Sequence, residues 1–421
     1  MPWMESGAMD QRMRFIVECD LKDLSMAELC RKYNISRKSG YKWRARVGEQ
    51  GVEGIKDRSR APHCHPNQVS AQIEQAILAM RAAHPTWGPK KLLRRLEDQD
   101  PAGGWPARST IAELLRRRGL AVPRRRRRHV PPHEQPFAAC GGPNAVWCVD
   151  FKGWFRTADG QRCDPLTITD AFSRYLIRCQ GTQDTGVEGV GPLFEAAFRQ
   201  WGLPWAIRSD NGSPFATGGV GGLSRLSVWW IKLGIRPERI KPGRPQQNGR
   251  HERMHLTLKR ETASPPAETL RAQQARFDAF GREFNFERPH EALGLATPAS
   301  LYTGSPRPYP SRLAEMTYPS EWIARVVRPC GQVRFKGSQF FLGQALIGEL
   351  VGLCPLDGRY WRAYFGPVSL GIYDAASGRM LRPPEIRRAA LTVPALAGKP
   401  PSAALQEASQ QGAKVLPMCL D

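Results

Sequence analysis

Three acidic residues lie at positions where a carboxylate is unexpected: within or at the end of a hydrophobic strand-like run, or among basic residues. Asp150 interrupts the hydrophobic run "VWCVDF", Asp210 closes "WAIRSD" before a turn, and Glu252 lies at the start of a basic helical segment. Burying an unpaired carboxylate is costly, and carboxylates held close together raise one another's pKa values unless a cation neutralises them. Since oxygen ligands suit Mg²⁺ or Mn²⁺, we predict that these three residues are catalytic metal ligands.

Ligands of this kind suit phosphodiester chemistry. Two divalent ions about 4 Å apart hold the attacking and leaving oxygens during an in-line displacement, without a covalent protein intermediate. Asp150, on a central strand, is the best placed to bridge both ions. Three alternatives stay open: a structural strand acid at Asp150, a plain turn at Asp210, and Glu261 in place of Glu252. Three further acids are expected in turns: Asp164, Asp170 and Asp184.

The elements around these acids predict an α/β domain. Strand-like runs include "AVWCVDF", "PLTITD", "RYLIRCQ", "PWAIRSD" and "IRPERI". Helical spacing occurs in "GPLFEAAFRQWG", "GLSRLSVWWIKLG" and "AQQARFDAFGREFNFERP". Strands followed by alternating helices and strands predict a mixed sheet flanked by helices.

Two helical units precede this domain. Residues 13–47 are expected to form three short helices, with a capping box at Ser25 and Glu28 and a cap at Ser36. This helix–turn–helix pattern predicts that its third helix binds DNA, and a three-helix bundle with a solvated basic face is the alternative. The candidate DNA-binding residues of that helix are Arg37, Lys38, Tyr41, Lys42, Trp43 and Arg44.

The second helical unit, residues 70–119, leads into a basic linker. Pro89 is expected in the first turn of a helix, and "TIAE" predicts a capping box at Thr110. The linker "VPRRRRRHVPP" then predicts either an arm that follows DNA phosphates or a soluble spacer. Its candidate DNA-binding residues are Arg124, Arg125 and Arg126.

Charge and composition narrow the class of partner. The chain has 62 Lys and Arg against 39 Asp and Glu, a formal charge of +23, which predicts binding to a polyanion. No apolar run approaches the roughly 20 residues that span a bilayer, so DNA is favoured over a membrane. There is no Cys-x-x-Cys pair, no secretory signal and no phosphate-binding Gly-rich loop. These absences argue against a zinc ribbon and a nucleotide cofactor, and we expect a cytoplasmic protein.

The C-terminal part is β-rich. Alternating runs around turn signals such as "LDG" predict a small β-barrel, followed by a tail expected to be disordered. The expected organisation is two helix–turn–helix domains (1–60 and 61–121), a basic linker (122–139), the α/β core (140–302), a linker (303–318), the barrel (319–386) and the tail (387–421).

The motifs "WCVDFKGWF", "RSDNGSPF" and "GRPQQNGRHERMHLTLKRE" resemble, in this order, the DDE integrase core of insertion-sequence transposases. The resemblance covers residues 145–301 and is close to the IS481 type, which is related to retroviral integrases. It implies an RNase H-like fold, a triad of Asp150, Asp210 and Glu252 with two Mg²⁺ or Mn²⁺ ions, and a DNA-contacting Lys259. Asn211 is expected to shape the loop beside the second aspartate and to contact DNA. That loop, "ATGGVGGLSR" included, is longer than in many such enzymes.

The function expected from this resemblance is that of a DNA transposase. It would cleave strands at the terminal inverted repeats of its element and transfer the 3′-hydroxyls to target DNA, as a homo-oligomer on DNA. A DNA-binding regulator with an inactive integrase-like core and a structure-selective nuclease are the alternatives.

Overall fold

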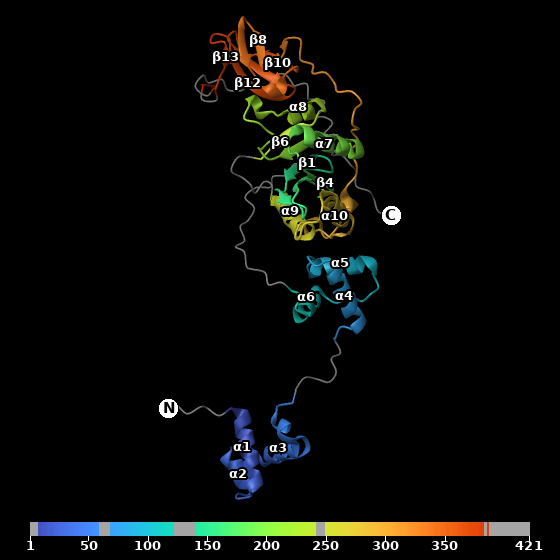
Figure 1. Ribbon diagram of the computed structural model, residues 1–421, viewed down its shortest axis with the longest axis vertical. Coiled ribbons are helices and arrows are strands. Elements are labelled where there is room, and N and C mark those ends of the chain that lie inside the picture. The colour runs from blue at the N-terminus through green and yellow to red at the C-terminus, as the bar shows by residue number, and fades with distance from the viewer. Residues whose placement is uncertain (1–6, 59–67, 122–139, 241–248, 383–384, 387–421) are drawn as a thin grey trace. The chain divides into compact units, whose positions relative to one another are not determined.

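The computed structural model describes residues 7–58, 68–121, 140–240, 249–382 and 385–386 (Figure 1). Backbone contacts divide the chain into two units, Met1–Ser70 and Ala71–Asp421. The linker arginines Arg124, Arg125 and Arg126 and the tail 387–421 lie outside the described residues.

The first unit is a three-helix domain. It contains α1 (Ala8–Leu21), α2 (Met26–Lys32), α3 (Arg37–Gln50) and a 3₁₀ turn (Gly51–Ile55). The predicted capping box is confirmed, because the Ser25 hydroxyl accepts from the Glu28 N–H and the Glu28 carboxylate accepts from the Ser25 N–H. The Ser36 hydroxyl caps α3 by accepting from the Ser39 N–H at 3.1 Å. Its core is formed by Phe15, Ile16, Cys19, Leu29, Cys30 and Trp43.

The second unit begins with three further helices, α4 (Ala71–Ala83), α5 (Pro89–Gln99) and α6 (Arg108–Arg117). Their core includes Ile77, Trp87, Leu92 and Ile111. Pro89 is the first residue of α5, as predicted. The capping box predicted at Thr110 is wrong, because α6 begins two residues earlier and the Thr110 N–H already bonds to the Ala107 carbonyl at 2.9 Å.

A mixed sheet forms the centre of the second unit, as the sequence predicts. Its strands are β1 (Val146–Phe151), β2 (Phe155–Arg156), β3 (Arg162–Asp170), β4 (Leu176–Thr182), β5 (Ala206–Ser209) and β6 (Arg236–Arg239). Strands β4, β3 and β1 pair antiparallel, whereas β1, β5 and β6 pair parallel. The two-residue strand β2 pairs with β3 and was not expected.

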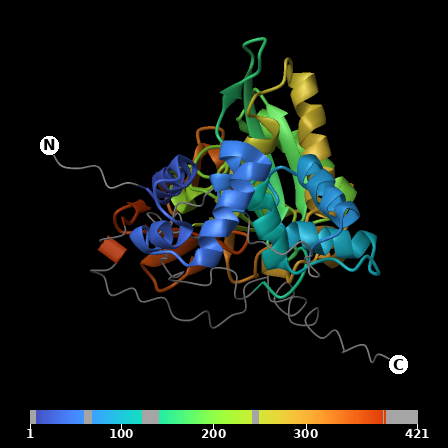
Figure 2. The ribbon, with the colours of Figure 1, turned by 90° about the horizontal axis from the view of Figure 1, so that it is seen from below.

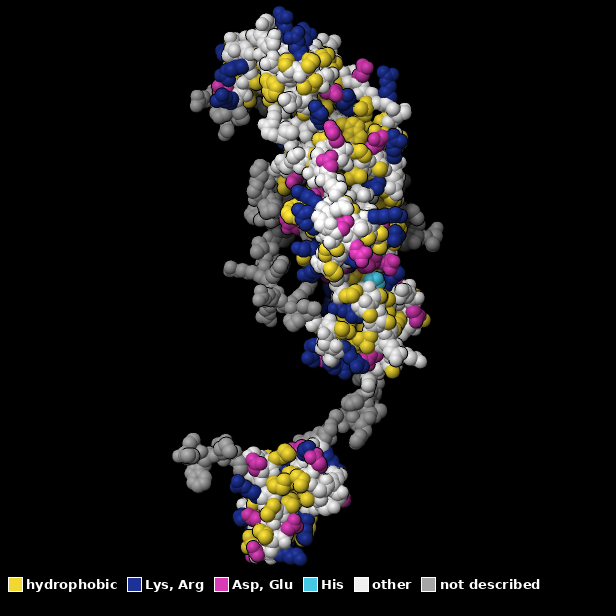
Figure 3. All heavy atoms as spheres, viewed as in Figure 1, with side chains coloured by type: hydrophobic (Ala, Val, Ile, Leu, Met, Phe, Trp, Pro, Cys, Tyr) yellow, Lys and Arg dark blue, Asp and Glu magenta, His cyan; other side chains and the backbone are white. Residues whose placement is uncertain are grey.

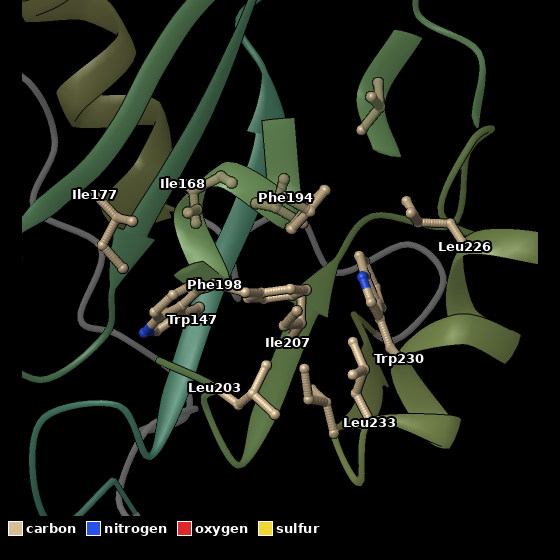
Figure 4. Packing of buried hydrophobic residues seen from close by; sticks show 14 of the residues in the cluster. Trp147, Ile168, Ile177, Phe194, Phe198, Leu203, Ile207, Leu226, Trp230 and Leu233 are labelled. Atoms are coloured by element: carbon tan, nitrogen blue, oxygen red, sulfur yellow. The ribbon is translucent and has the colours of Figure 1, made fainter. Parts of the chain in front are cut away.

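Helices cover both faces of this sheet. On one face α7 (Val187–Trp201) and α8 (Arg225–Lys232) pack on a core that includes Trp147, Phe198 and Ile207 (Figure 4). On the other face α9 (Gly249–Thr262) and α10 (Leu270–Arg282) pack through Met254, Leu258 and Phe277; the yellow α9–α10 segment lies beside the green strands in Figure 2. Short helical turns occupy Val220–Gly222, Glu283–Glu287, Glu291–Leu293 and Pro298–Leu301.

The C-terminal part is a second sheet. It contains β7 (Ile323–Val326), β8 (Gln332–Phe335), β9 (Ser338–Phe341), a turn at Gln344–Leu346, β10 (Leu350–Pro355), β11 (Tyr360–Phe365), β12 (Val368–Asp374) and β13 (Arg379–Met380). Five strands pair in the order β13–β12–β11–β10–β7, and β8–β9 is a separate hairpin. Over the described residues β7 and β13 remain edge strands, so the expected closed barrel is not found. The sheet shares one hydrophobic core with Leu223, Val228 and Ile231 of the α8 region.

None of the helices that the structure describes is both long and apolar enough to cross a membrane.

Candidate active site

Two acids of the predicted triad lie at the carboxyl ends of two neighbouring inner strands of the central sheet. β1 and β5 are parallel, and Cys148 is opposite Arg208. Continued by two residues, this register places Asp150, in β1, opposite Asp210, the residue after β5. Adjacent parallel strands thus bring together two carboxylates that are far apart in the sequence.

Both acids face the side of the sheet that α9 and α10 cover. Successive side chains of a strand alternate between its faces. Trp147 and Val149 pack in the core under α7 and α8, so Asp150 points to the opposite face. Ile207 of β5 lies in the same core, and continued alternation places Asp210 on the face of Asp150.

A hydrogen-bond network ties α9, the helix of Glu252, to the strand beside Asp150. Thr167 of β3 is the antiparallel partner of Asp150, and its hydroxyl donates to the Asp150 carbonyl oxygen at 3.1 Å. The Nε2 atoms of His251 and His255 lie 2.8 Å and 2.7 Å from the same hydroxyl oxygen. Because Glu252 follows His251, its backbone is fixed relative to Asp150 through Thr167.

The two histidines of this network are neutral at pH 7. The Thr167 hydroxyl has one hydrogen, which it donates to the carbonyl, so both Nε2 atoms act as donors. Burial, and then the neighbouring His255, hold the pKa of His251 well below its usual value. Burial, and then Lys152, lower the pKa of His255 to about 4. We therefore assign one proton to each ring, on Nε2.

The turn after β5 is held by its own hydrogen bonds. Asp210 Oδ1 accepts from the Gly212 N–H at 3.2 Å. Asn211 is exposed, and its side-chain amide donates to the Ile240 carbonyl oxygen at 3.0 Å. Asn211 thereby joins the chain after β5 to the chain after β6.

Two lysines accompany the carboxylates. Lys259 is exposed on α9, seven residues after the exposed Glu252. Lys152 is half-buried two residues after Asp150, and its ammonium lies 5.3 Å from the Phe155 ring centroid. Burial, and then the charge of Lys259, lower the pKa of Lys152, so the two ammonium groups lie near each other. Sequence reasoning overlooked Lys152, although a lysine two residues after a strand acid was an available signal.

Glu261, the alternative to Glu252, has a structural partner. Its carboxylate pairs with Arg288, whose side chain is buried, and also accepts from the Thr86 hydroxyl of the α4–α5 loop. A carboxylate held in this way at the end of α9 supports the fold, and this favours Glu252 as the third acid.

The three acids that were expected in turns are each held by contacts within the fold. Asp164 lies within β3 rather than in a turn and pairs with Arg162 at 2.6 Å. Asp170, the last residue of β3, is fully buried, and burial raises its pKa. Asp184 accepts from the Gly186 N–H at 2.7 Å in the turn before α7.

Asp150, Asp210 and the helix of Glu252 share one face of the sheet, but their side chains do not form a compact cluster. Among the described residues, no three His, Cys, Asp or Glu side chains lie close enough together to hold a metal ion. The three donors are all carboxylates, which fit Mg²⁺ or Mn²⁺ better than zinc. The segment that leads into α9, residues 241–248, lies outside the described part of the chain.

The predicted DNA-binding residues of α3 fall into two groups. Trp43 is buried in the core of the first unit, with the Arg12 guanidinium 4.2 Å from its ring centroid. This burial argues against a direct contact between the Trp43 side chain and DNA. The other five are exposed: Arg37, Lys38, Tyr41, Lys42 and Arg44. On the face seen in Figure 3, Lys and Arg side chains occur on all described parts of the chain.

Comparison with protein families agrees with this arrangement. Integrase core domain models match residues 141–245 and 233–298. A helix-turn-helix domain model matches residues 11–63, and a homeodomain-like domain model matches residues 39–115. The integrase matches contain all three predicted acids.

Two curated relatives come from insertion elements. The "Insertion element IS407 uncharacterized 31.7 kDa protein" of Burkholderia multivorans is 31% identical over 195 residues, covering 45% of this chain and 67% of that protein. The "Insertion element IS476 uncharacterized 39.2 kDa protein" of Xanthomonas euvesicatoria is 28% identical over 241 residues, covering 56% and 66%. Among solved structures, the catalytic core domain of BIV integrase is 20% identical, with a TM-score of 0.30 over 38% of this chain and 93% of that chain. On the integrase core domain matches and the 31% identical relative, the chain belongs to the insertion-element transposases with an integrase core domain.

Proposed function

We propose that the protein cuts DNA strands at the terminal inverted repeats of its own element and transfers the freed 3′-hydroxyls to target DNA, in a reaction that requires divalent metal ions. Asp150, Asp210 and Glu252 are the metal ligands in this proposal. The observation that carries it is the register of β1 and β5, which sets Asp150 opposite Asp210 on the face covered by the helix of Glu252.

The donor set suits two Mg²⁺ or Mn²⁺ ions per active site. Proteins with an integrase core generally depend on divalent metal ions. When bound, such ions polarise the attacking water or 3′-hydroxyl and stabilise the leaving oxyanion. Asp150 lies between two paired strands, β3 and β5, and is therefore the most firmly placed of the three ligands.

The chain's own residues orient this chemistry. Thr167, His251 and His255 hold the Glu252 helix against the strand of Asp150. Lys259 would attract the phosphates of the strand that is cut, because a Lys side chain contacts the DNA backbone without reading sequence. The mechanism requires no Ser, Tyr or Cys nucleophile.

Recognition of the element would come from the N-terminal domains. The helix-turn-helix match supports DNA binding, and we assign the contacts to the exposed residues of α3 and the arginines of the 122–139 linker. Two ends must be held at once, so we propose a homo-oligomer on DNA in the bacterial cytoplasm. The C-terminal part, a sheet and a hairpin that share one core, would add DNA or protein contacts. The IS481 assignment and the domain boundaries stay predictions.

The test uses Asp150→Asn with Asp184→Asn as the matched control, since Asp184 is an exposed acid of the same domain. Asp150→Asn should fold and bind duplex terminal repeats but give no Mg²⁺-dependent nicks or strand-transfer products, whereas Asp184→Asn should retain both. Nicking by Asp150→Asn would refute the assignment. Wild-type protein that binds the repeats without nicking would indicate a regulator, and nicking without joining would indicate a nuclease.

A further inference from the structure

A tryptophan immediately before β2 is exposed to solvent, on the side of the β2–β3 hairpin away from α10. Trp154 is 57% exposed and follows Asp150 by four residues. Its neighbour Phe155 points the other way and packs edge-on against Phe277 of α10, with ring centroids 6.5 Å apart. Phe155 therefore packs in the core, whereas Trp154 is exposed to solvent. Neither residue has a role in the proposed chemistry.

Two arginines flank the exposed indole. The guanidinium carbons of Arg162 and Arg156 lie 5.2 Å and 5.9 Å from its ring centroid. Each arginine has its own anchor, because Arg162 pairs with Asp164 at 2.6 Å and Arg156 donates to the Gly160 carbonyl oxygen at 2.7 Å. The ring is thus flanked by two guanidinium groups that are already positioned, and that of Arg162 is ion-paired with Asp164.

The hairpin itself is fixed to the core. The N–H groups of Ala158 and Asp159, at its tip, donate to the carbonyl oxygens of Ala267 and Glu268 before α10, both at 3.0 Å. The surface that Trp154 presents is therefore built before any ligand arrives. Because this surface is already ordered, binding does not incur the entropy cost of ordering it, which favours affinity.

We propose that Trp154 is a stacking platform for an unpaired base of single-stranded DNA that the protein holds. The proposal rests on the proposed function, since it takes DNA as the ligand of the integrase core. An exposed aromatic ring among basic side chains is the arrangement by which proteins hold single-stranded DNA, because every base has a face that can stack. Arg156 and Arg162 supply the charge that follows the adjacent phosphates.

The experiment measures DNA binding without metal, so that it does not depend on cleavage. Full-length protein is titrated into a fluorescein-labelled 15-nucleotide oligo-dT and into a blunt duplex, followed by anisotropy. Trp154→Ala should weaken oligo-dT binding by about 5- to 150-fold, the range found when one stacking residue is removed, and should change duplex binding less than about twofold. Trp154→Phe should retain most of the affinity. Phe286→Ala, at a 58% exposed aromatic of the Glu283–Glu287 turn, is the control and should have no effect.

The salt dependence separates stacking from charge. Trp154→Ala should leave the slope of log affinity against log salt unchanged, whereas Arg156→Gln should reduce it by about 0.7, the value per phosphate contact on a single strand. Equal losses on oligo-dT and duplex, or unchanged oligo-dT affinity in Trp154→Ala, would overturn the proposal. Unchanged affinity together with lost self-association in sedimentation would assign the ring to a protein contact instead. The catalytic assignment is tested separately, by the nicking assay of Asp150→Asn, so its failure is distinguishable from a failure of the stacking proposal.

Discussion

Replacing Thr167 by valine should loosen the Glu252 helix from the sheet. Valine keeps the branched shape and suits a strand, so β3 itself should remain intact. The substitution removes the hydroxyl that connects the Asp150 carbonyl with His251 and His255. Three polar groups then lose the same partner at a position with no solvent exposure.

The expected cost follows from burial. A buried polar group that loses its partner costs about 1–3 kcal/mol. His251 is 3% exposed and bears this cost in full, whereas the half-buried His255 can recover part of it from water. We therefore expect about 3 kcal/mol for α9. Thr169→Val is the matched control: its hydroxyl lies at the 3.5 Å limit from His251 Nδ1, so we expect less than about 1 kcal/mol.

Hydrogen exchange measures this locally in the full-length chain. Peptides within residues 251–262 report the opening of α9, and about 3 kcal/mol corresponds to roughly 150-fold faster exchange when opening limits protection. Exchange in α7, on the opposite face, should change little, and Mg²⁺-dependent nicking should fall while metal-free DNA binding persists. If Thr167→Val leaves α9 exchange unchanged, or changes it no more than Thr169→Val does, the network does not hold the helix.

Two further predictions concern buried charges. Glu252→Gln should abolish nicking without lowering the midpoint of thermal unfolding. Glu261→Gln should lower that midpoint by several degrees in calorimetry, because it leaves the buried Arg288 with only its longer ion pair, to Glu283 at 3.6 Å. Burial, then Lys91 and Arg288, lower the pKa of His290 to about 3, below its usual value near 6.5. The unfolded chain therefore takes up the proton first, and the stability from a neutral His290 is present above pH 6.5 and is lost as the pH falls toward 3. Between pH 7 and pH 4.5 we expect His290 to lower the free energy of unfolding, measured in urea, by about 2–3 kcal/mol. The free energy of unfolding of His290→Asn should fall by that much less over the same pH range. An equal fall in the variant would contradict the prediction.

Much of the local structure was predictable from short-range signals. The capping box at Ser25 and Glu28 announces α2, and the buried-type run around Asp150 announces β1. The wrong prediction at Thr110 shows the limit of such signals, because the same four-residue pattern also fits the interior of a helix that begins two residues earlier. The two-residue strand β2 is too short to show alternation.

The candidate site was predictable only in part. Motif order identified Asp150 and Asp210, but their register depends on a pairing between strands about 60 residues apart, which no local pattern encodes. The role of Thr167 depends on the same long-range packing. Trp43 was assigned to DNA from its basic neighbours, whereas its spacing from Gly40 and Val47 places it on the inward stripe of α3.

The C-terminal sheet and the catalytic domain bury part of their surfaces against each other. Leu223, Val228 and Ile231 pack among the sheet's own residues, and Lys232 pairs with Glu349 at 2.8 Å. A truncation that stops before β7 would therefore expose these apolar side chains around α8 to solvent and promote aggregation. Loss of activity in such a fragment would say little about the role of the sheet itself. Conversely, a ligand that displaces the C-terminal sheet on binding would also displace α8, because the two share a core, and through α8 the strand that follows, β6.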